Sequence, residues 1–157
     1  MAQAVVDTDH LPRLQGTVHI LYSKWYPDYV NTMLRRCRTV LEGCGLQVVT
    51  HRLPGTLELG FAADQVTREP PRPDALVCLG VVLRGETLHF DMIVDEVARA
   101  LGEVARKSGV RVINEVLPVN SLSEAAARCG DDDRNKGIEA AVAAVEMIQW
   151  KRTFPRT

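Results

Sequence analysis

The stretch VVLRGETLHFD, residues Val81 to Asp91, decides how this chain folds. The residues that lead into it, Ala75 to Leu83, are continuously apolar, which is typical of a strand buried on both faces of a parallel sheet. The residues that follow, His89 to Ser108, repeat their apolar positions at the helical period. A buried strand that enters a helix through a short loop is the unit of an α/β protein, whose ligands bind at the carboxyl ends of the strands.

The loop within this stretch combines an anion site with an acid–base group. Gly85 allows a tight turn, and Thr87 is expected to cap the helix that follows. Helix N-termini attract anions, phosphate above all. His89 lies in the first turn beside that position, where an imidazole can transfer a proton near neutral pH. A lone histidine at a helix start more often has no role, and the Gly-containing loop at a strand end is what favours a functional one.

Outside this stretch, the chain alternates strands and helices. Strands are expected at residues 18–23, 46–53, 75–83 and 110–117, with Asn114 at the end of the fourth strand and Pro118 closing it. Helices are expected at residues 28–41, 57–66, 89–108, 121–129 and 134–150. Thr56 would cap the second helix, and a loose tail would begin at Arg152. The alternation predicts an α/β fold, a three-layer αβα sandwich with a four-stranded parallel sheet.

The composition excludes several classes of protein. The chain has 157 residues, of which 46% are hydrophobic and 25% charged, and its formal net charge is −1. It therefore lacks the basic footprint of a nucleic-acid-binding protein. No apolar run is long enough to span a membrane, and residues 1–15 lack the layout of a signal peptide, so we expect a cytoplasmic protein. Residues 1–15 are expected to form a flexible arm or an intersubunit strand, and residues 16–157 a single domain.

The cysteines follow no metal-binding pattern. Two of them are seven residues apart near one helix, and a third lies in a predicted core strand. The four are Cys37, Cys44, Cys78 and Cys129. We expect free, reduced thiols and no metal site.

The central loop also resembles the signature loop of the lumazine synthases. That signature is V or I, R or K, G, any residue, T, any residue, H, F or Y, and D or E, and Leu83 to Asp91 reads LRGETLHFD. Three further matches follow the family order: Trp25, the segment Pro54 to Glu58, and Arg128 with Asn135-Lys136-Gly137. The resemblance covers almost the whole chain. It implies the flavodoxin-like strand order 2-1-3-4, which periodicity alone does not give.

The resemblance implies a reaction and a role for each matching residue. Lumazine synthases condense 5-amino-6-(D-ribitylamino)uracil with 3,4-dihydroxy-2-butanone 4-phosphate in riboflavin biosynthesis, without a cofactor, and release phosphate and water. His89 would be the catalytic proton-transfer residue. The residues expected to contact the ribitylaminouracil are Trp25, Thr56, Leu57, Glu58, Val82, Leu83, Arg84, Asn114 and Lys136. The residues expected to contact the butanone phosphate are Glu86, Thr87 and Arg128.

The resemblance further implies a homopentamer, or a larger assembly of pentamers, with each active site shared between neighbouring subunits. One chain would supply the residues that follow the first three strands. The next chain would supply Asn114, Arg128 and Lys136. Oligomerisation would then be required for activity.

Several of these positions have a plainer explanation or depart from the family pattern. Trp25 could be an exposed turn residue or a subunit contact, Glu58 a carboxylate at a helix N-terminus, and Arg128 a solvated helix charge. Leu57 replaces the usual aromatic residue, and Asn114 replaces the usual phenylalanine. Two alternative functions follow: a catalytically weak paralogue that binds a flavin or lumazine, and an archaeal-type riboflavin synthase on the same scaffold.

Overall fold

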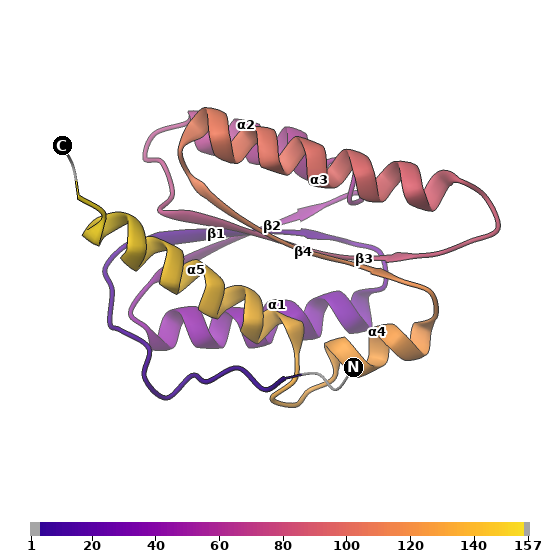
Figure 1. Cartoon of the computed structure of the whole chain (residues 1–157), viewed down its shortest axis with the longest axis horizontal. Helices are drawn as coiled ribbons and strands as arrows, with labels where there is room; N and C mark the ends of the chain where they lie inside the picture. Colours follow the sequence, from indigo (N-terminus) through magenta and orange to yellow (C-terminus); the bar gives the residue numbers. More distant parts are fainter. Residues whose placement is uncertain (1–3, 156–157) are drawn as a thin grey trace.

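A computed structural model describes residues 4–155, which form four strands and five helices (Figure 1). In chain order these are β1 (Thr17–Ser23), α1 (Pro27–Gly43), β2 (Gln47–Leu53), α2 (Leu59–Arg68), β3 (Ala75–Leu83), α3 (His89–Ser108), β4 (Arg111–Val119), α4 (Leu122–Cys129) and α5 (Lys136–Thr153). Each strand and helix expected from the sequence is present.

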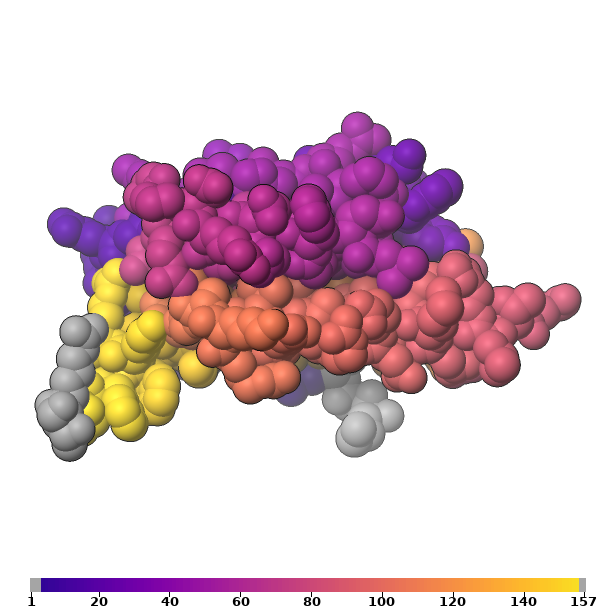
Figure 2. Space-filling view, turned by 90° about the horizontal axis from the view of Figure 1, so that it is seen from above, coloured from indigo at the N-terminus to yellow at the C-terminus, as the bar shows by residue number. Residues whose placement is uncertain are grey.

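The strands form one parallel sheet in the order β2-β1-β3-β4. Helices α2 and α3 cover one face of the sheet, and α1, α4 and α5 cover the other (Figure 1). Figure 2 views the molecule from the side of α2 and α3, with the loop before α3 projecting at one end. The predicted three-layer flavodoxin-like fold and its strand order are both confirmed.

The most deeply buried strand is β3, which lies between β1 and β4. All of its residues except Leu83 are buried. Val77 and Leu79 pack into the core beneath α1 and α5, while Leu76 and Cys78 pack into the core beneath α2 and α3. A strand with two apolar faces needs a helical layer on each side, which is why the sheet is covered twice.

The fourth strand is longer than expected. Pro118 does not end β4, because the strand continues to Val119 and Pro118 pairs with Val82 of β3. β4 is an edge strand, where a residue without an N–H is tolerated. Asn114 consequently lies in the middle of β4, opposite Cys78, and its expected place at the strand end was wrong.

The second helix begins later than expected. Thr56 does not cap it with its side chain; the Thr56 carbonyl oxygen accepts the Leu59 N–H at 3.1 Å. The cap position is occupied by Glu58, which makes no side-chain capping bond. The polar residues after β2 are therefore part of a turn at the sheet edge rather than of the first turn of α2.

The described parts of the two chain ends lie against the body of the protein. In the arm, the Leu14 N–H donates to the Cys44 carbonyl at 2.8 Å. At the other end α5 continues to Thr153, and Arg152 donates to the Gln15 carbonyl at 2.6 Å. The loose tail predicted from Arg152 was therefore wrong for that residue. Flexibility of the arm stays a prediction, and residues 1–3 and 156–157 lie outside the described residues.

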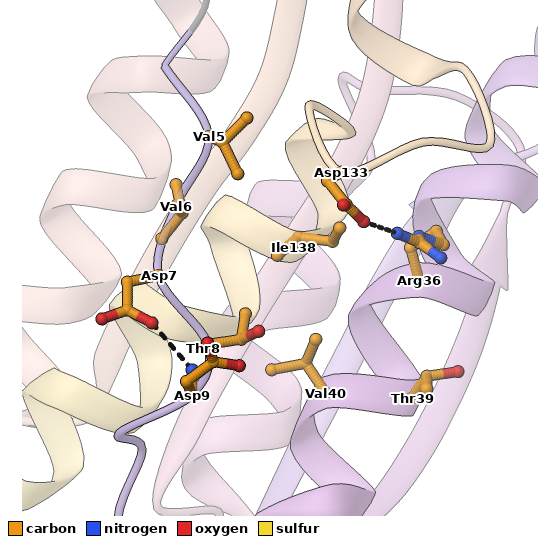
Figure 3. Close-up of a pocket in the computed structure, with 10 residues that line it drawn as sticks. All are labelled: Val5, Val6, Asp7, Thr8, Asp9, Arg36, Thr39, Val40, Asp133 and Ile138. Atoms are coloured by element: carbon orange, nitrogen blue, oxygen red, sulfur yellow. Dashed lines mark hydrogen bonds and ion pairs between the residues drawn. The ribbon is translucent and has the colours of Figure 1, made fainter.

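A cavity of about 530 Å³ separates the start of the arm from α1 and α5 (Figure 3). Val5 and Val6 line it on the arm side, and Ile138 faces it from α5. Arg36 and Asp133 form an ion pair at 3.0 Å beside it. The described arm residues thus cover the helical face without joining the sheet, and their predicted role as an intersubunit strand stays untested.

The four cysteines are buried and free, as predicted. Burial raises the pKa of Cys78 to about 12 and that of Cys129 to about 11, so these thiols are unreactive near neutral pH. Within residues 4–155, three or more His, Cys, Asp or Glu side chains nowhere gather in a way that could hold a metal ion. In the same part of the chain, none of the helices has the length and apolar character needed to cross a membrane.

A close approach of α5 to α1 depends on Gly137. A β-carbon at this position would lie 2.1 Å from the Met33 carbonyl oxygen of α1. Substitution by alanine would push α5 away from a backbone atom that cannot rotate aside. We expect Gly137→Ala to lower the free energy of unfolding by about 3 kcal/mol, measured by urea denaturation.

Gly43 supplies the matched control, because a β-carbon there would meet nothing within 4 Å. Gly43→Ala should leave the free energy of unfolding unchanged or raise it by up to about 0.5 kcal/mol. Equal losses in the two variants would contradict the packing explanation.

Candidate functional site

A pocket of about 260 Å³ opens at the carboxyl ends of β1 and β3. It is lined by residues from the strand ends, the turns that follow β1 and β2, and the start of α3: Ser23, Trp25, Tyr26, Thr56, Val81, Val82, Leu83, His89 and Ile93. The predicted site residues among them are Trp25, Thr56, Val82, Leu83 and His89. Segments far apart in the sequence thus meet at the sheet edge where ligands were expected.

The turn after β1 presents two aromatic residues to this pocket. Trp25 is 60% exposed, and its backbone N–H donates to the Ser23 hydroxyl at 3.2 Å. Tyr26 has a left-handed backbone with φ of 54°, which is unusual for a bulky residue and marks local strain. Its carbonyl oxygen accepts the Val30 N–H at 3.1 Å at the start of α1. Tyr26 was not predicted from the sequence, although the following Pro27 disfavours the ordinary helical conformation there.

Thr56 reaches the sheet because Gly80 leaves room for it. A β-carbon at Gly80 would lie only 2.7 Å from the Thr56 Cγ2 atom. Thr56 is consequently buried at the floor of the pocket, although it belongs to a turn. Gly80 was also missed from the sequence; its signal is a single glycine within an otherwise apolar strand, which often marks a close approach.

Gly55 lies next to a carboxylate and an indole. A β-carbon at Gly55 would lie 2.9 Å from Glu58 Oε2 and 3.6 Å from Trp25 Nε1. The side chains of Glu58, Trp25 and Leu57 are all exposed. A carboxylate can accept hydrogen bonds and an indole N–H can donate one, so this turn offers both kinds of group to solvent.

Hydrogen bonds of Arg84 connect the loop after β3 to the segment where β4 ends, before α4. Its backbone N–H donates to the Val119 carbonyl at 2.8 Å, and its Nε donates to the Asn120 Oδ1 at 3.1 Å. The guanidinium lies 4.3 Å from the Phe90 ring centre and 3.5 Å from an Asp91 carboxylate oxygen. Its side chain is therefore engaged outside the pocket, and a ligand would meet the backbone at this position.

Thr87 caps the start of α3 in part. Its hydroxyl oxygen accepts the His89 backbone N–H at 3.3 Å, although the residue before the helix is Leu88. The Glu86 and Thr87 side chains are exposed on the projecting loop and do not line the pocket. The loop nevertheless sets a helix N-terminus beside the imidazole of His89, which is the arrangement expected for anion binding next to proton transfer.

The remaining predicted residues lie elsewhere on the chain. Asn114 is exposed on edge strand β4, and its side-chain oxygen accepts the Val116 N–H at 3.1 Å. Arg128 donates to the Glu124 carbonyl at 3.1 Å, and Lys136 forms an ion pair with Glu139. Arg128 and Lys136 belong to the helices on the other face of the sheet, so a single chain does not bring them to the pocket.

Glu115 is an unexpected carboxylate beside Lys136. It lies on β4 opposite Leu79, on the face beneath α1 and α5. Burial raises the pKa of Glu115 to about 7, the charge of Glu139 adds to the increase, and Lys136 opposes it. The group is therefore partly protonated at neutral pH, which the sequence did not reveal because its burial depends on tertiary packing.

These features define a class of protein: an α/β protein of flavodoxin-like architecture, with a pocket at the carboxyl edge of its parallel sheet. The family model described as 6,7-dimethyl-8-ribityllumazine synthase matches residues 15–152. A 6,7-dimethyl-8-ribityllumazine synthase of Nitrobacter winogradskyi is 35% identical over 143 residues, covering 88% of each chain. One of Xanthomonas euvesicatoria is 33% identical over 139 residues, covering 87% of this chain and 90% of the relative.

The chain therefore belongs to the lumazine synthase family, and by that membership it is a transferase of riboflavin biosynthesis. The resemblance of the central loop is confirmed as a family relationship.

The raised pKa of Glu115 predicts a pH-dependent stability. Between the unfolded value of 4.5 and the folded value of about 7, the folded chain retains a proton that the unfolded chain releases. Stability from this group is thus lost as the pH rises through about 7. Glu115→Gln should be about as stable as the parent at pH 4.5 and more stable by about 2 kcal/mol at pH 8.

Urea denaturation at fixed protein concentration measures this difference. Glu146→Gln, which removes an exposed carboxylate from α5, is the matched control. A stability difference for Glu115→Gln that stays constant with pH would contradict the assignment.

Proposed function

We propose that this chain is a 6,7-dimethyl-8-ribityllumazine synthase that condenses 5-amino-6-(D-ribitylamino)uracil with 3,4-dihydroxy-2-butanone 4-phosphate. The single observation that carries the proposal is the pocket that joins Trp25, Thr56, Leu83 and His89 at the carboxyl edge of the sheet. Family membership supports it independently. Localisation in the cytoplasm, where the small-molecule substrates would be available, belongs to the same proposal.

In this proposal the ribitylaminouracil lies against Trp25. The exposed indole stacks on the pyrimidine ring, and the backbone of Val82 to Arg84 reads the ring edge. The exposed Glu58 carboxylate accepts hydrogen bonds from the ribityl hydroxyls. The buried Thr56 and the neighbouring Leu57 complete this side of the pocket.

The butanone phosphate binds at the projecting loop. The backbone N–H groups of Glu86 and Thr87 and the Thr87 hydroxyl receive the phosphate at the N-terminus of α3. The Glu86 side chain points away from the anion, because two negative charges repel. Arg128 of a neighbouring subunit adds a guanidinium, whose paired donors match phosphate oxygens.

The chemistry then requires orientation and proton transfer. The substrate amine attacks the ketone and forms an imine with loss of water; phosphate leaves, the intermediate tautomerises, and the second ring closes with loss of a second water. His89 exchanges protons with the reacting atoms during these steps. Holding both substrates in register supplies much of the acceleration.

Two observations support a site shared between subunits. Arg128 and Lys136 do not line the pocket of their own chain, and Asn114 is exposed on an edge strand. Large apolar side chains are also exposed in and just before α2 and at the start of α3: Leu57 at 41%, Phe61 at 74%, Leu88 at 82% and Met92 at 55%. Exposed large apolar side chains of this kind favour a subunit contact. We infer a homopentamer, or a larger assembly of pentamers, whose neighbours complete each site.

Activity can be tested by following lumazine fluorescence after mixing both substrates with purified protein. His89→Ala should reduce kcat by about 100-fold through lost proton transfer. Arg128→Ala should chiefly raise KM for the butanone phosphate, because a charged contact is lost. Arg38→Ala, which breaks an exposed ion pair with Glu42 on α1, is the control and should leave both constants unchanged.

A parent rate no faster than the uncatalysed reaction, from assembled protein, would contradict the synthase. Tight flavin or lumazine binding without turnover would then favour the weak paralogue. Conversion of lumazine to riboflavin would instead indicate the riboflavin synthase reaction.

The shared site makes a second prediction. His89→Ala and Arg128→Ala chains co-expressed with different tags should form mixed rings in which some sites combine an intact histidine with an intact arginine from the neighbour. With random mixing, about a quarter of the sites should be complete, and activity should recover to about that fraction. Activity in isolated mixed rings no higher than the average of the two parent variants would show that each site lies within one chain.

A further inference from the structure

A second pocket, of about 310 Å³, lies at the amino end of the sheet, where β4 begins and α3 and α5 end. Its charged lining consists of four cations and one carboxylate: Arg72, Arg111, Lys151, Arg152 and Asp74. The lining therefore carries an excess of positive charge in a small space.

Three of the cations have a structural role. Arg72 donates to the Ser108 carbonyl, and Lys151 donates to the Gly109 carbonyl at 2.7 Å, both at the end of α3. Arg152 donates to a carbonyl in the chain before β1. Helix ends leave carbonyl oxygens without partners, and basic side chains commonly satisfy them.

The carboxylate is also engaged. Asp74 Oδ2 accepts the Thr17 backbone N–H at 2.9 Å, at the start of β1. Its other oxygen lies 3.2 Å from the Arg152 guanidinium. Both oxygens of Asp74 are thus used by other groups, so it does not serve as a dedicated counterion for the remaining cation.

That remaining cation is Arg111, the first residue of β4. Within residues 4–155, its buried Nε atom has no hydrogen-bond partner. Burial lowers the pKa of Arg111, Asp74 opposes this effect, and the charge of Arg152 adds to it. Buried donors are nearly always paired in folded proteins. We therefore expect this guanidinium to bind an acceptor that the described chain does not supply.

We propose that this pocket binds an oxyanion, namely a phosphate group that is free or attached to a small organic molecule, with Arg111 as its principal ligand. The planar fork of a guanidinium matches two oxygens of a phosphate. The surrounding cations add favourable charge while keeping their carbonyl partners. The pocket volume exceeds that of one phosphate, which leaves space for a small organic part.

This site is separate from the proposed active site. The two lie at opposite ends of β3, whose nine residues extend about 25 Å. Figure 2 likewise shows the yellow end of α5 and the projecting loop before α3 at opposite ends of the molecule. The butanone phosphate bound at the loop therefore cannot occupy this pocket, and the inference goes beyond the synthase reaction.

The test is calorimetric titration of the full-length assembled protein with inorganic phosphate, in chloride buffers of constant ionic strength. The Arg128→Ala variant serves as the starting protein, because it weakens phosphate binding at the proposed active site. Adding Arg111→Gln should weaken the remaining phosphate affinity by at least about 10-fold. Arg99→Gln, which removes an exposed arginine of α3, is the matched control and should not alter it.

A parallel titration with ribose 5-phosphate distinguishes the two sources of the phosphate group. Tighter binding than that of inorganic phosphate indicates a phosphorylated metabolite, and equal binding indicates the free anion; both support the site. If Arg111→Gln fails to fold, Arg111→Lys, which keeps the charge but loses the paired donors, should weaken binding by about threefold or more. Unchanged affinity in the folded Arg111 variant, or no phosphate binding once Arg128 is removed, would overturn the proposal.

Discussion

Burial of β3 on both faces is the constraint from which the rest of the architecture follows. Its apolar side chains alternate between two cores, so each face of the sheet must carry a helical layer. Because the strands are all parallel, their carboxyl ends lie at one edge of the sheet. Ser23, Thr56 and Leu83 meet at that edge for this reason, and Gly80 allows the turn after β2 to approach closely enough to close the pocket.

The sequence was a good guide to features that depend on local periodicity and a poor guide to those that depend on tertiary contact. Apolar spacing located each helix and strand, and the family signature supplied the strand order. Pro118 suggested a strand end only because its edge position was unknown. The raised pKa of Glu115 likewise arises from packing between distant segments, which no window of sequence contains.

The sheet divides the candidate residues into two groups. Trp25, Thr56 and His89 line a pocket at its carboxyl edge, while Arg128 and Lys136 belong to helices on the face of α1. Neither Arg128 nor Lys136 lines that pocket. If both groups act on one substrate pair, a neighbouring chain can supply the second group, and the exposed apolar residues Phe61 of α2 and Met92 of α3 provide surface that association would bury.

Because the strands are parallel, the two edges of the sheet also differ in the charge that they favour. Helix N-termini gather at the carboxyl edge of the sheet and favour anions, whereas helix C-termini gather at the amino edge and favour cations. Arg72 and Lys151 are cations at the amino edge, where they bind carbonyl oxygens at the end of α3. Arg111 differs because it begins a strand, and its buried Nε has no hydrogen-bond partner within residues 4–155. Helix dipoles explain the cations around it but not Arg111 itself, and a bound anion is the simplest partner for this half-buried guanidinium in such surroundings.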